Sequence, residues 1–290
     1  MEDPRLEHRI TARTKVYCLM GKPIEHSLSP LIHNASFRAM KLDCVYVAFN
    51  VEPSSLADAL RSLRALGIQG ANLTHPYKTE ALRFLDEADH DVLVTRSVNT
   101  IKNESGVLKG FNTDGYGALR ALIDALGDLN GLRIAVVGAG GAGRSLVYRL
   151  SMFDCEVYLL NRTLERAKEF VKGLRKTSKA KLYYAGFDDT SSISKADVLV
   201  NATPIGMTLP GTPVSPRYLK DQLLVFDMVY DPPKTPLLME AEKRGIKTLN
   251  GLPMLVYQAA EAEKLWLGVE PPLDVMFEVA YRACRERATL

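Results

Sequence analysis

The stretch RIAVVGAGGAGRSLVYRL at residues 133–150 joins a short apolar run, a glycine-rich turn and a helical pattern. Its centre matches G-x-G-x-x-G and consists of Gly138, Ala139, Gly140, Gly141, Ala142 and Gly143. The first glycine permits a tight turn, the second lets the backbone approach a pyrophosphate, and the third lets helix and strand pack closely. The free N–H groups at the helix start favour phosphate. The stretch predicts the first βα unit of a Rossmann-type dinucleotide-binding domain, with an ordinary glycine-rich turn as the alternative.

The next strand, expected at residues 157–160, is followed by Asn161, Arg162 and Thr163. A site for NAD usually places Asp or Glu at this strand end, where the carboxylate holds the ribose 2′-hydroxyl. Here Arg162 and Arg166 follow instead, and guanidinium groups bind phosphate through charged hydrogen bonds of ~1.5–3 kcal/mol each. The pattern favours NADP(H) over NAD. In the alternative interpretation, Thr163 is only a helix N-cap and Arg166 lies on a solvated helix face.

Short β-rich runs alternate with helical patterns along the chain, which predicts an α/β architecture with mainly parallel sheets. With 290 residues, 47% of them hydrophobic, the chain is long enough for two domains of ~100–200 residues each. A break at residues 127–131 indicates a join between an N-terminal α/β domain and the doubly wound dinucleotide-binding domain. We expect strands near 16–20, 45–51, 68–73, 98–102, 107–110, 133–137, 157–160, 198–201 and 225–227, and final helices near 252–267 and 272–287. Residues 1–14 are expected to be a loosely docked extension.

Composition excludes several classes of function. The 37 basic and 34 acidic residues give a net charge of +3, too weak to indicate a nucleic-acid or membrane partner. No apolar run approaches the ~18 residues needed to span a bilayer, and the N-terminus lacks a secretory signal. Four widely spaced cysteines predict reduced thiols and a cytoplasmic location. The five histidines show no metal-ligand spacing, so no metal is expected.

Two polar segments of the first half are candidates for catalysis. NLTHPYK at residues 72–78 leaves the end of a strand, where ligands gather in open α/β sheets, and NTDG at 112–115 begins a helix. Reduction of a ketone needs a proton donor, and a lysine beside a carboxylate that favours its charged form is suitable. Lys78 and Asp114 are the natural pair, although spacing alone does not join them. Lys78 as a solvated helix residue and Asp114 as an N-cap are the alternatives.

Two further polar residues stand out. Ser29 precedes Pro30, an arrangement that in isolation favours a simple helix N-cap. Gln258 falls on the apolar stripe of a late helical pattern, and a buried amide without partners would cost ~1–3 kcal/mol. A ligand hydroxyl and a neighbouring backbone group are equally suitable partners for Gln258.

Together these segments resemble the shikimate dehydrogenase family. The similar motifs come in the family's order between about residues 16 and 285, and they comprise GKPIEHSLSPLIHN at 21–34, NLTHPYK at 72–78, SVNT at 97–100, GFNTDG at 110–115, GAGGAGR at 138–144, NRT at 161–163, NATPIGM at 201–207, DMVYDP at 227–232 and NGLPML at 250–255. The resemblance implies reversible NADPH-dependent reduction of 3-dehydroshikimate to shikimate, in the pathway to chorismate and the aromatic amino acids.

The resemblance also implies roles at matching positions. Ser27 and Ser29 would bind the substrate carboxylate, and Lys78, paired with Asp114, would pass a proton to or from the reacting oxygen. Tyr230 would close the pocket. The ring hydroxyls would be bound by Thr74, Asn99, Asp114 and Gln258. The cofactor would be bound by residues 138–143, by Asn161, Arg162, Thr163 and Arg166 at its 2′-phosphate, and by Thr203, Met207, Met228 and Gly251 near the nicotinamide.

In the family fold, residues 1–113 would form the substrate domain, residues 114–251 the NADP domain, and residues 252–290 would return to the first domain. The partner would be shikimate or 3-dehydroshikimate, and a homodimer is compatible with the sequence. The chain departs from the family at Arg96-Ser97, where Gly-Ala is usual. Two alternatives stay open. One is a quinate/shikimate dehydrogenase that uses NAD or NADP, and the other is a non-catalytic dinucleotide-binding regulator.

Overall fold

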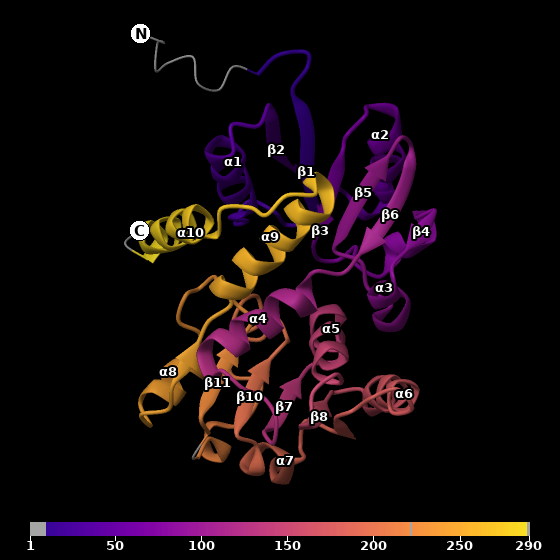
Figure 1. Cartoon of the computed structure of the whole chain (residues 1–290). Coiled ribbons are helices and arrows are strands. Elements are labelled where there is room, and N and C mark those ends of the chain that lie inside the picture. The colour runs from indigo at the N-terminus through magenta and orange to yellow at the C-terminus, as the bar shows by residue number, and fades with distance from the viewer. Residues whose placement is uncertain (1–9, 221, 289–290) are drawn as a thin grey trace. The chain divides into compact units, whose positions relative to one another are not determined.

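The structure is a computed structural model that describes residues 10–220 and 222–288 (Figure 1). Most of the expected N-terminal extension, residues 1–9, lies outside the described residues. The chain divides into two compact units. The first contains the residues up to Thr113 together with Ala259–Arg285, and the second contains Asp114–Gln258 with the last residues of the chain.

A mixed six-stranded sheet forms the centre of the first unit, in the order β2-β1-β3-β5-β6-β4. The strands are β1 (Lys15–Gly21), β2 (Cys44–Asn50), β3 (Gly70–Leu73), β4 (Glu87–Ala88), β5 (Thr100–Glu104) and β6 (Val107–Phe111). Strand β1 pairs in parallel with β2 and β3, whereas β5 runs antiparallel to β3 and β6. The strands expected near residues 98–102 and 107–110 are therefore confirmed, as the antiparallel hairpin β5–β6.

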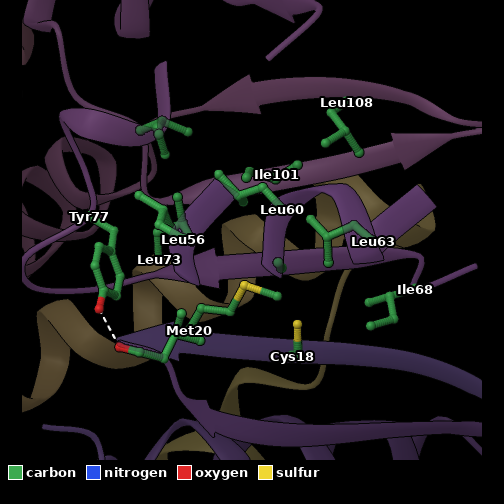
Figure 2. Close-up of a cluster of buried hydrophobic side chains, with 14 of the residues drawn as sticks. Cys18, Met20, Leu56, Leu60, Leu63, Ile68, Leu73, Tyr77, Ile101 and Leu108 are labelled. Atoms are coloured by element: carbon green, nitrogen blue, oxygen red, sulfur yellow. Dashed lines mark hydrogen bonds between the residues drawn. The ribbon is translucent and has the colours of Figure 1, made fainter. Parts of the chain in front are cut away.

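One face of this sheet is covered by helix α2 (Leu56–Ala65). Leu56, Leu60 and Leu63 recur at helical spacing and are fully buried against strand residues such as Ile101 and Leu108 (Figure 2). This stripe buries apolar side chains, which is the main favourable term in folding. The other helices of this part are α1 (Ser29–Ala39), α3 (His90–Thr95) and the 3₁₀ segments Pro53–Ser55 and Glu80–Phe84.

The last two helices are α9 (Leu252–Leu267) and α10 (Leu273–Ala288). Within the first unit, Trp266 of α9 packs with Tyr17 of β1 and donates a hydrogen bond of 2.9 Å from Nε1 to the Ile101 carbonyl. A Cβ at Gly70 would lie 2.4 Å from the Trp266 ring, so this position requires glycine. The expected return of the C-terminal helices to the N-terminal sheet is confirmed.

The second unit contains a parallel six-stranded sheet in the order β12-β11-β10-β7-β8-β9. Counted from β7, this is the Rossmann order 3-2-1-4-5-6, with its switch point between β7 and β10. The strands are β7 (Arg133–Val137), β8 (Glu156–Leu160), β9 (Lys181–Ala185), β10 (Val198–Asn201), β11 (Leu224–Asp227) and β12 (Thr248–Leu249). The helices are α4 (Asp114–Leu126), α5 (Gly141–Leu150), α6 (Leu164–Leu174), α7 (Thr190–Lys195) and α8 (Pro236–Glu242). The predicted doubly wound fold is confirmed.

Several short elements were not predicted from the sequence, namely α3, α7, α8, β4, β9 and β12. Each has at most seven residues, too few for a clear hydrophobic period. Within the described residues, no helix is both long enough and apolar enough to cross a bilayer.

Candidate active site

The glycine turn after β7 has the geometry that its sequence predicts. Gly138 has a φ of +111°, and a Cβ there would lie 2.9 Å from the Ala202 carbonyl oxygen. A Cβ at Gly143 would lie 1.9 Å from the Gly138 oxygen, so this position packs against backbone. A Cβ at Gly140 would meet nothing within 4 Å in the described structure. The backbone at the start of α5 therefore has open space beside it, which suits an approaching phosphate.

Two side chains hold this turn in place. The Asn161 side chain accepts a hydrogen bond of 3.0 Å from the Ala139 N–H and donates one of 2.8 Å to the Thr163 carbonyl. Arg144 donates from Nη1 to the Ala139 carbonyl at 2.8 Å. Burial lowers the pKa of Arg144, and the nearby positive charge of Arg166 lowers it further. Asn161 thus connects the glycine turn to the loop after β8.

The basic residues after β8 are exposed. Thr163 is in the N-cap position of α6, but its side chain makes no capping hydrogen bond. Within residues 10–220 and 222–288, neither Arg162 nor Arg166 forms an ion pair with a carboxylate. Two guanidinium groups and a hydroxyl are therefore available to an anion beside the glycine turn.

A buried polar cluster connects the loops that follow β10 and β11. The Asp227 carboxylate accepts hydrogen bonds from Asn201 Nδ2 at 2.9 Å, the Val229 N–H at 3.1 Å and Thr235 Oγ1 at 2.7 Å. Burial raises the pKa of Asp227, and these hydrogen bonds partly oppose the rise. Asn201 Oδ1 also accepts from Thr203 Oγ1 at 2.7 Å. The two loops are thus held by one carboxylate.

Four predicted cofactor contacts lie on or beside these loops. Thr203 is fixed by Asn201, and Met207 is 41% exposed after β10. Met228 is half-buried, and a Cβ at Gly251 would lie 2.0 Å from the Met228 carbonyl oxygen. The Gly251 N–H donates to the Val229 carbonyl at 2.9 Å. Only glycine fits at position 251, where the chain passes directly beside the loop after β11.

In the first unit, the carboxyl ends of β1 and β3 meet closely. A Cβ at Gly21 would lie 2.2 Å from Thr74 Cγ2, and the Lys22 N–H donates to the His75 carbonyl at 3.0 Å. Lys78 lies in the turn that follows, and its carbonyl accepts from the Val98 N–H at 2.8 Å. The backbone that carries Thr74 and Lys78 is therefore fastened to two neighbouring strands.

The two candidate serines adjoin the start of α1. The helix begins at Ser29 and its N-cap position is Leu28, so the interpretation of Ser29 as the N-cap is wrong. The Ser29 N–H donates to Ser27 Oγ at 3.2 Å. Ser29 is buried, yet among the described residues its hydroxyl has no hydrogen-bond partner. Because Ser27 Oγ is the acceptor in this bond, the hydroxyl protons of Ser27 and Ser29 are both available to a ligand.

Asn99 is held by reciprocal hydrogen bonds with Thr113. Asn99 Nδ2 donates to Thr113 Oγ1 at 2.9 Å, and the Thr113 N–H donates to Asn99 Oδ1 at 2.8 Å. Thr113 is the last residue of the first unit, and Asp114 begins α4 in the second. Asn99 and Thr113 are almost fully buried, which gives the amide a defined orientation.

Asp114 and Gln258 are positioned within the second unit. The Gly115 N–H donates to Ser145 Oγ at 2.9 Å, which fixes the first turn of α4 against α5. A Cβ at Gly117 would lie 2.9 Å from Gln258 Cβ, so α4 and α9 pack closely at this glycine. Gln258 Nε2 donates to the Leu255 carbonyl at 3.0 Å. The backbone partner considered for Gln258 is therefore present.

Comparisons with known proteins agree over most of the chain. Family models match residues 19–101 (shikimate dehydrogenase substrate binding domain), 121–211 (shikimate / quinate 5-dehydrogenase) and 251–281 (shikimate 5′-dehydrogenase C-terminal domain). The chain is 43% identical over 275 residues to the shikimate dehydrogenase (NADP(+)) of Methanocaldococcus jannaschii, covering 92% of this chain and 96% of that protein. The chain belongs to the shikimate dehydrogenase family.

Solved structures of the family agree with the fold. A shikimate dehydrogenase in complex with NADP+ has a TM-score of 0.89 at 41% identity, covering 95% of this chain and 98% of that chain. The Thermus thermophilus shikimate 5-dehydrogenase in complex with NADP(H) and shikimate has a TM-score of 0.83 at 34% identity, covering 93% of this chain and 99% of that chain.

At Arg96-Ser97, where the chain departs from the family pattern, the backbone has the conformation that suits the family's usual glycine. Arg96 ends α3 in the left-handed region with a φ of 51°, a conformation that glycine adopts at less cost. Ser97 is fully buried, and among the described residues its hydroxyl has no hydrogen-bond partner. With these residues in place, the β5–β6 hairpin that follows Asn99 still forms.

Sequence reasoning assigned no role to several residues that shape these sites. Asn201 and Asp227 end adjacent apolar strands, and the rule that ligands gather at the carboxyl ends of parallel strands would have selected both. Arg144 follows the glycine motif directly. Thr113 shows no comparable signal, because its role depends on the pairing with Asn99.

Proposed function

We propose that the chain catalyses the reversible NADPH-dependent reduction of 3-dehydroshikimate to shikimate. The observation that carries the proposal is the likeness of both units, over 92% of the chain, to a shikimate dehydrogenase (NADP(+)). The local geometry supports it, because buried or anchored polar groups gather at the strand ends of each unit. The reaction is a step toward chorismate and the aromatic amino acids.

The second unit fits NADP(H). The open backbone at Gly140 and the N-terminus of α5 suit the pyrophosphate, so residues 138–143 would hold it. Arg162, Thr163 and Arg166 would hold the 2′-phosphate, because both guanidinium groups are exposed and have no carboxylate partner among the described residues, which suits a dianion. The loops that Asp227 connects would adjoin the nicotinamide. Bound NADPH supplies the hydride, and NADP+ accepts it in the reverse direction.

The chemistry assigned to the protein is binding and proton transfer. Ser27 and Ser29 would donate hydrogen bonds to the substrate carboxylate. Thr74, Asn99, Asp114 and Gln258 would bind the ring hydroxyls, and Tyr230 would cover the substrate. As the carbonyl carbon accepts a hydride, the Lys78 ammonium would donate a proton to the oxygen, so that the C=O becomes a C–OH. Asp114 would act with Lys78 as the second member of the acid–base pair.

Three broader proposals accompany this function. Residues 1–113 with 252–290 would form the substrate domain, and residues 114–251 the NADP domain. The protein would act in the cytoplasm, which agrees with free thiols at Cys18, Cys44 and Cys155. Its oligomeric state would be a homodimer, which analytical ultracentrifugation tests directly.

The decisive experiment is a steady-state comparison of shikimate and quinate, each with NADP+ and NAD+. We expect the highest kcat/KM for shikimate with NADP+, because discrimination depends on the ratio of these values. A higher value for quinate, or for NAD+, would support the quinate/shikimate alternative. Binding of NADP+ without turnover of shikimate or quinate would indicate a non-catalytic regulator.

A further inference from the structure

A fully buried carboxylate of the first unit takes no part in the chemistry described above. Glu263 lies on α9, and its side chain, like that of His33 on α1, has no exposed surface. Glu263 Oε1 lies 2.7 Å from His33 Nδ1, and Ser36 Oγ donates to Oε2 at 2.5 Å. Both oxygens are therefore bound to the same helix, so Glu263 fixes α1 against α9.

The contacts of His33 extend this connection across the sheet. The His33 ring stacks on Tyr46 with centroids 4.2 Å apart and planes 18° from parallel. The Tyr46 hydroxyl donates to Asn72 Oδ1 at 2.8 Å. Asn72 Nδ2 donates in turn to the Asn99 carbonyl at 3.2 Å. A continuous buried series of contacts thus runs from Glu263 to the backbone of Asn99.

The two ends of this series carry proposed substrate contacts. Ser29 is the first residue of α1, one helical turn before His33, so the position of its hydroxyl follows the position of α1. Asn99 is held at the other end through its carbonyl and through Thr113. Binding groups need such support, because small displacements weaken their hydrogen bonds.

A buried carboxylate is costly to desolvate, and apolar residues of similar volume often stabilise a core equally well. Stability alone therefore does not account for Glu263. We propose that Glu263 is a positioning residue for the substrate, holding Ser29 and Asn99 in their binding geometry through His33 and Ser36. This inference depends on the proposed function, because it assumes that Ser29 and Asn99 bind shikimate.

The test compares Glu263→Leu with Glu263→Gln. Leucine leaves His33 Nδ1 and Ser36 Oγ without an acceptor, so we expect the KM for shikimate to rise ~10-fold. The KM for NADP+ should stay within ~2-fold of the wild-type value, because the support that is lost is for groups that bind shikimate and not the cofactor. Glutamine keeps one acceptor oxygen for His33, and the Ser36 hydroxyl can reverse to accept from the amide. Glu263→Gln should therefore restore the shikimate KM to within ~3-fold of the wild type.

Leu60→Ala is the matched control for destabilisation. Leu60 is fully buried on α2 in the same unit and makes no polar contact in the series (Figure 2). This variant should lower Tm without changing the KM for shikimate. An equal rise in KM for Leu60→Ala would overturn the inference, as would a Glu263→Leu enzyme with lowered Tm and an unchanged KM.

Two further measurements keep the outcomes distinct. If Glu263→Leu does not fold, Ser36→Ala removes one of the two donors, and it should raise the shikimate KM ~3-fold without affecting NADP+. An unchanged shikimate KM in Ser36→Ala would then overturn the inference. A wild-type enzyme that does not oxidise shikimate would instead refute the proposed function, and it would do so before any variant is made.

Discussion

Asn99 and Thr113 are bound to each other by hydrogen bonds of 2.9 Å, 2.8 Å and 3.3 Å, although fourteen positions separate them in the sequence. The pairing joins the start of the β5–β6 hairpin to the residue that precedes Asp114. The pairing thus fixes the amide of Asn99, a proposed substrate-binding residue, and the backbone of Thr113.

Thr113→Val should weaken substrate binding. Valine keeps the shape of the side chain but removes the Oγ1 atom that accepts from Asn99 Nδ2 at 2.9 Å, and the loss of such a buried hydrogen bond costs ~0.5–1.5 kcal/mol. We expect a lower Tm and a KM for shikimate raised by about 10-fold, measured by thermal unfolding and steady-state kinetics. Thr113→Ser retains the hydroxyl and should behave like the wild type. A normal KM in Thr113→Val would show that Asn99 does not need this partner.

Lys78→Ala tests the acid–base assignment. Removing a general acid should reduce kcat by ~10²–10⁴-fold, while the Kd for NADP+ stays nearly unchanged. Stopped assays give kcat, and cofactor fluorescence gives Kd. Arg83→Ala is the control, because Arg83 is an exposed cation of the same unit whose partner is Glu80. Parallel loss of turnover and NADP+ binding in Lys78→Ala would point to misfolding.

Arg162→Ala should reduce the preference for NADP+. Loss of a charged hydrogen bond of ~1.5–3 kcal/mol to the 2′-phosphate corresponds to binding weakened by about 10- to 150-fold. The Kd for NAD+ should change little, because NAD+ lacks that phosphate. Isothermal titration calorimetry with both cofactors measures this. Lys172→Ala, an exposed cation on α6, is the control. Equal weakening of both cofactors would contradict the assignment.

Ser97→Ala should stabilise the protein. The buried Ser97 hydroxyl has no partner among the described residues, so its removal saves a desolvation penalty of ~1 kcal/mol or more. For a chain of this size, we expect Tm to rise by about 2–4 °C. Ser145→Ala is the opposite case, because Ser145 Oγ accepts from the Gly115 N–H at 2.9 Å, and its loss should lower Tm. A lower Tm for Ser97→Ala would reveal a partner, such as an ordered water.

Asp197 should contribute to stability in a manner that depends on pH. Hydrogen bonds from Arg133, the nearest at 2.7 Å, lower the pKa of Asp197 below its usual 3.8. A carboxyl group with a lowered pKa in the folded state stabilises above its unfolded pKa, and that contribution is lost as pH falls through the folded pKa. The Tm of Asp197→Asn should therefore lie below that of the wild type near pH ~7 and approach it below pH ~3. A difference independent of pH would exclude this charge effect.

Local sequence predicted much of the fold. The glycine positions, the strands around them and the bounds of α9 could be predicted because each depends on near neighbours in the chain. The choice of Arg162 and Arg166 also followed from the single strand end that precedes them. The short elements were missed because a segment of so few residues shows no clear hydrophobic period. Asn201 and Asp227 each end an apolar strand, which marks them as candidates, but the hydrogen bond between them connects two strands and no local pattern predicts it.

The sequence by itself determined the doubly wound architecture, the glycine turn and the candidate residues. Each of these depends on backbone sterics or on hydrophobic periodicity, and both involve residues that are close together in the sequence. Only the tertiary structure decided that His33 contacts Glu263, 230 positions away, and that Asn99 is held by Thr113. Those contacts arise when separate elements pack and buried polar groups must find partners. Such partners depend on the three-dimensional arrangement, which no local pattern encodes.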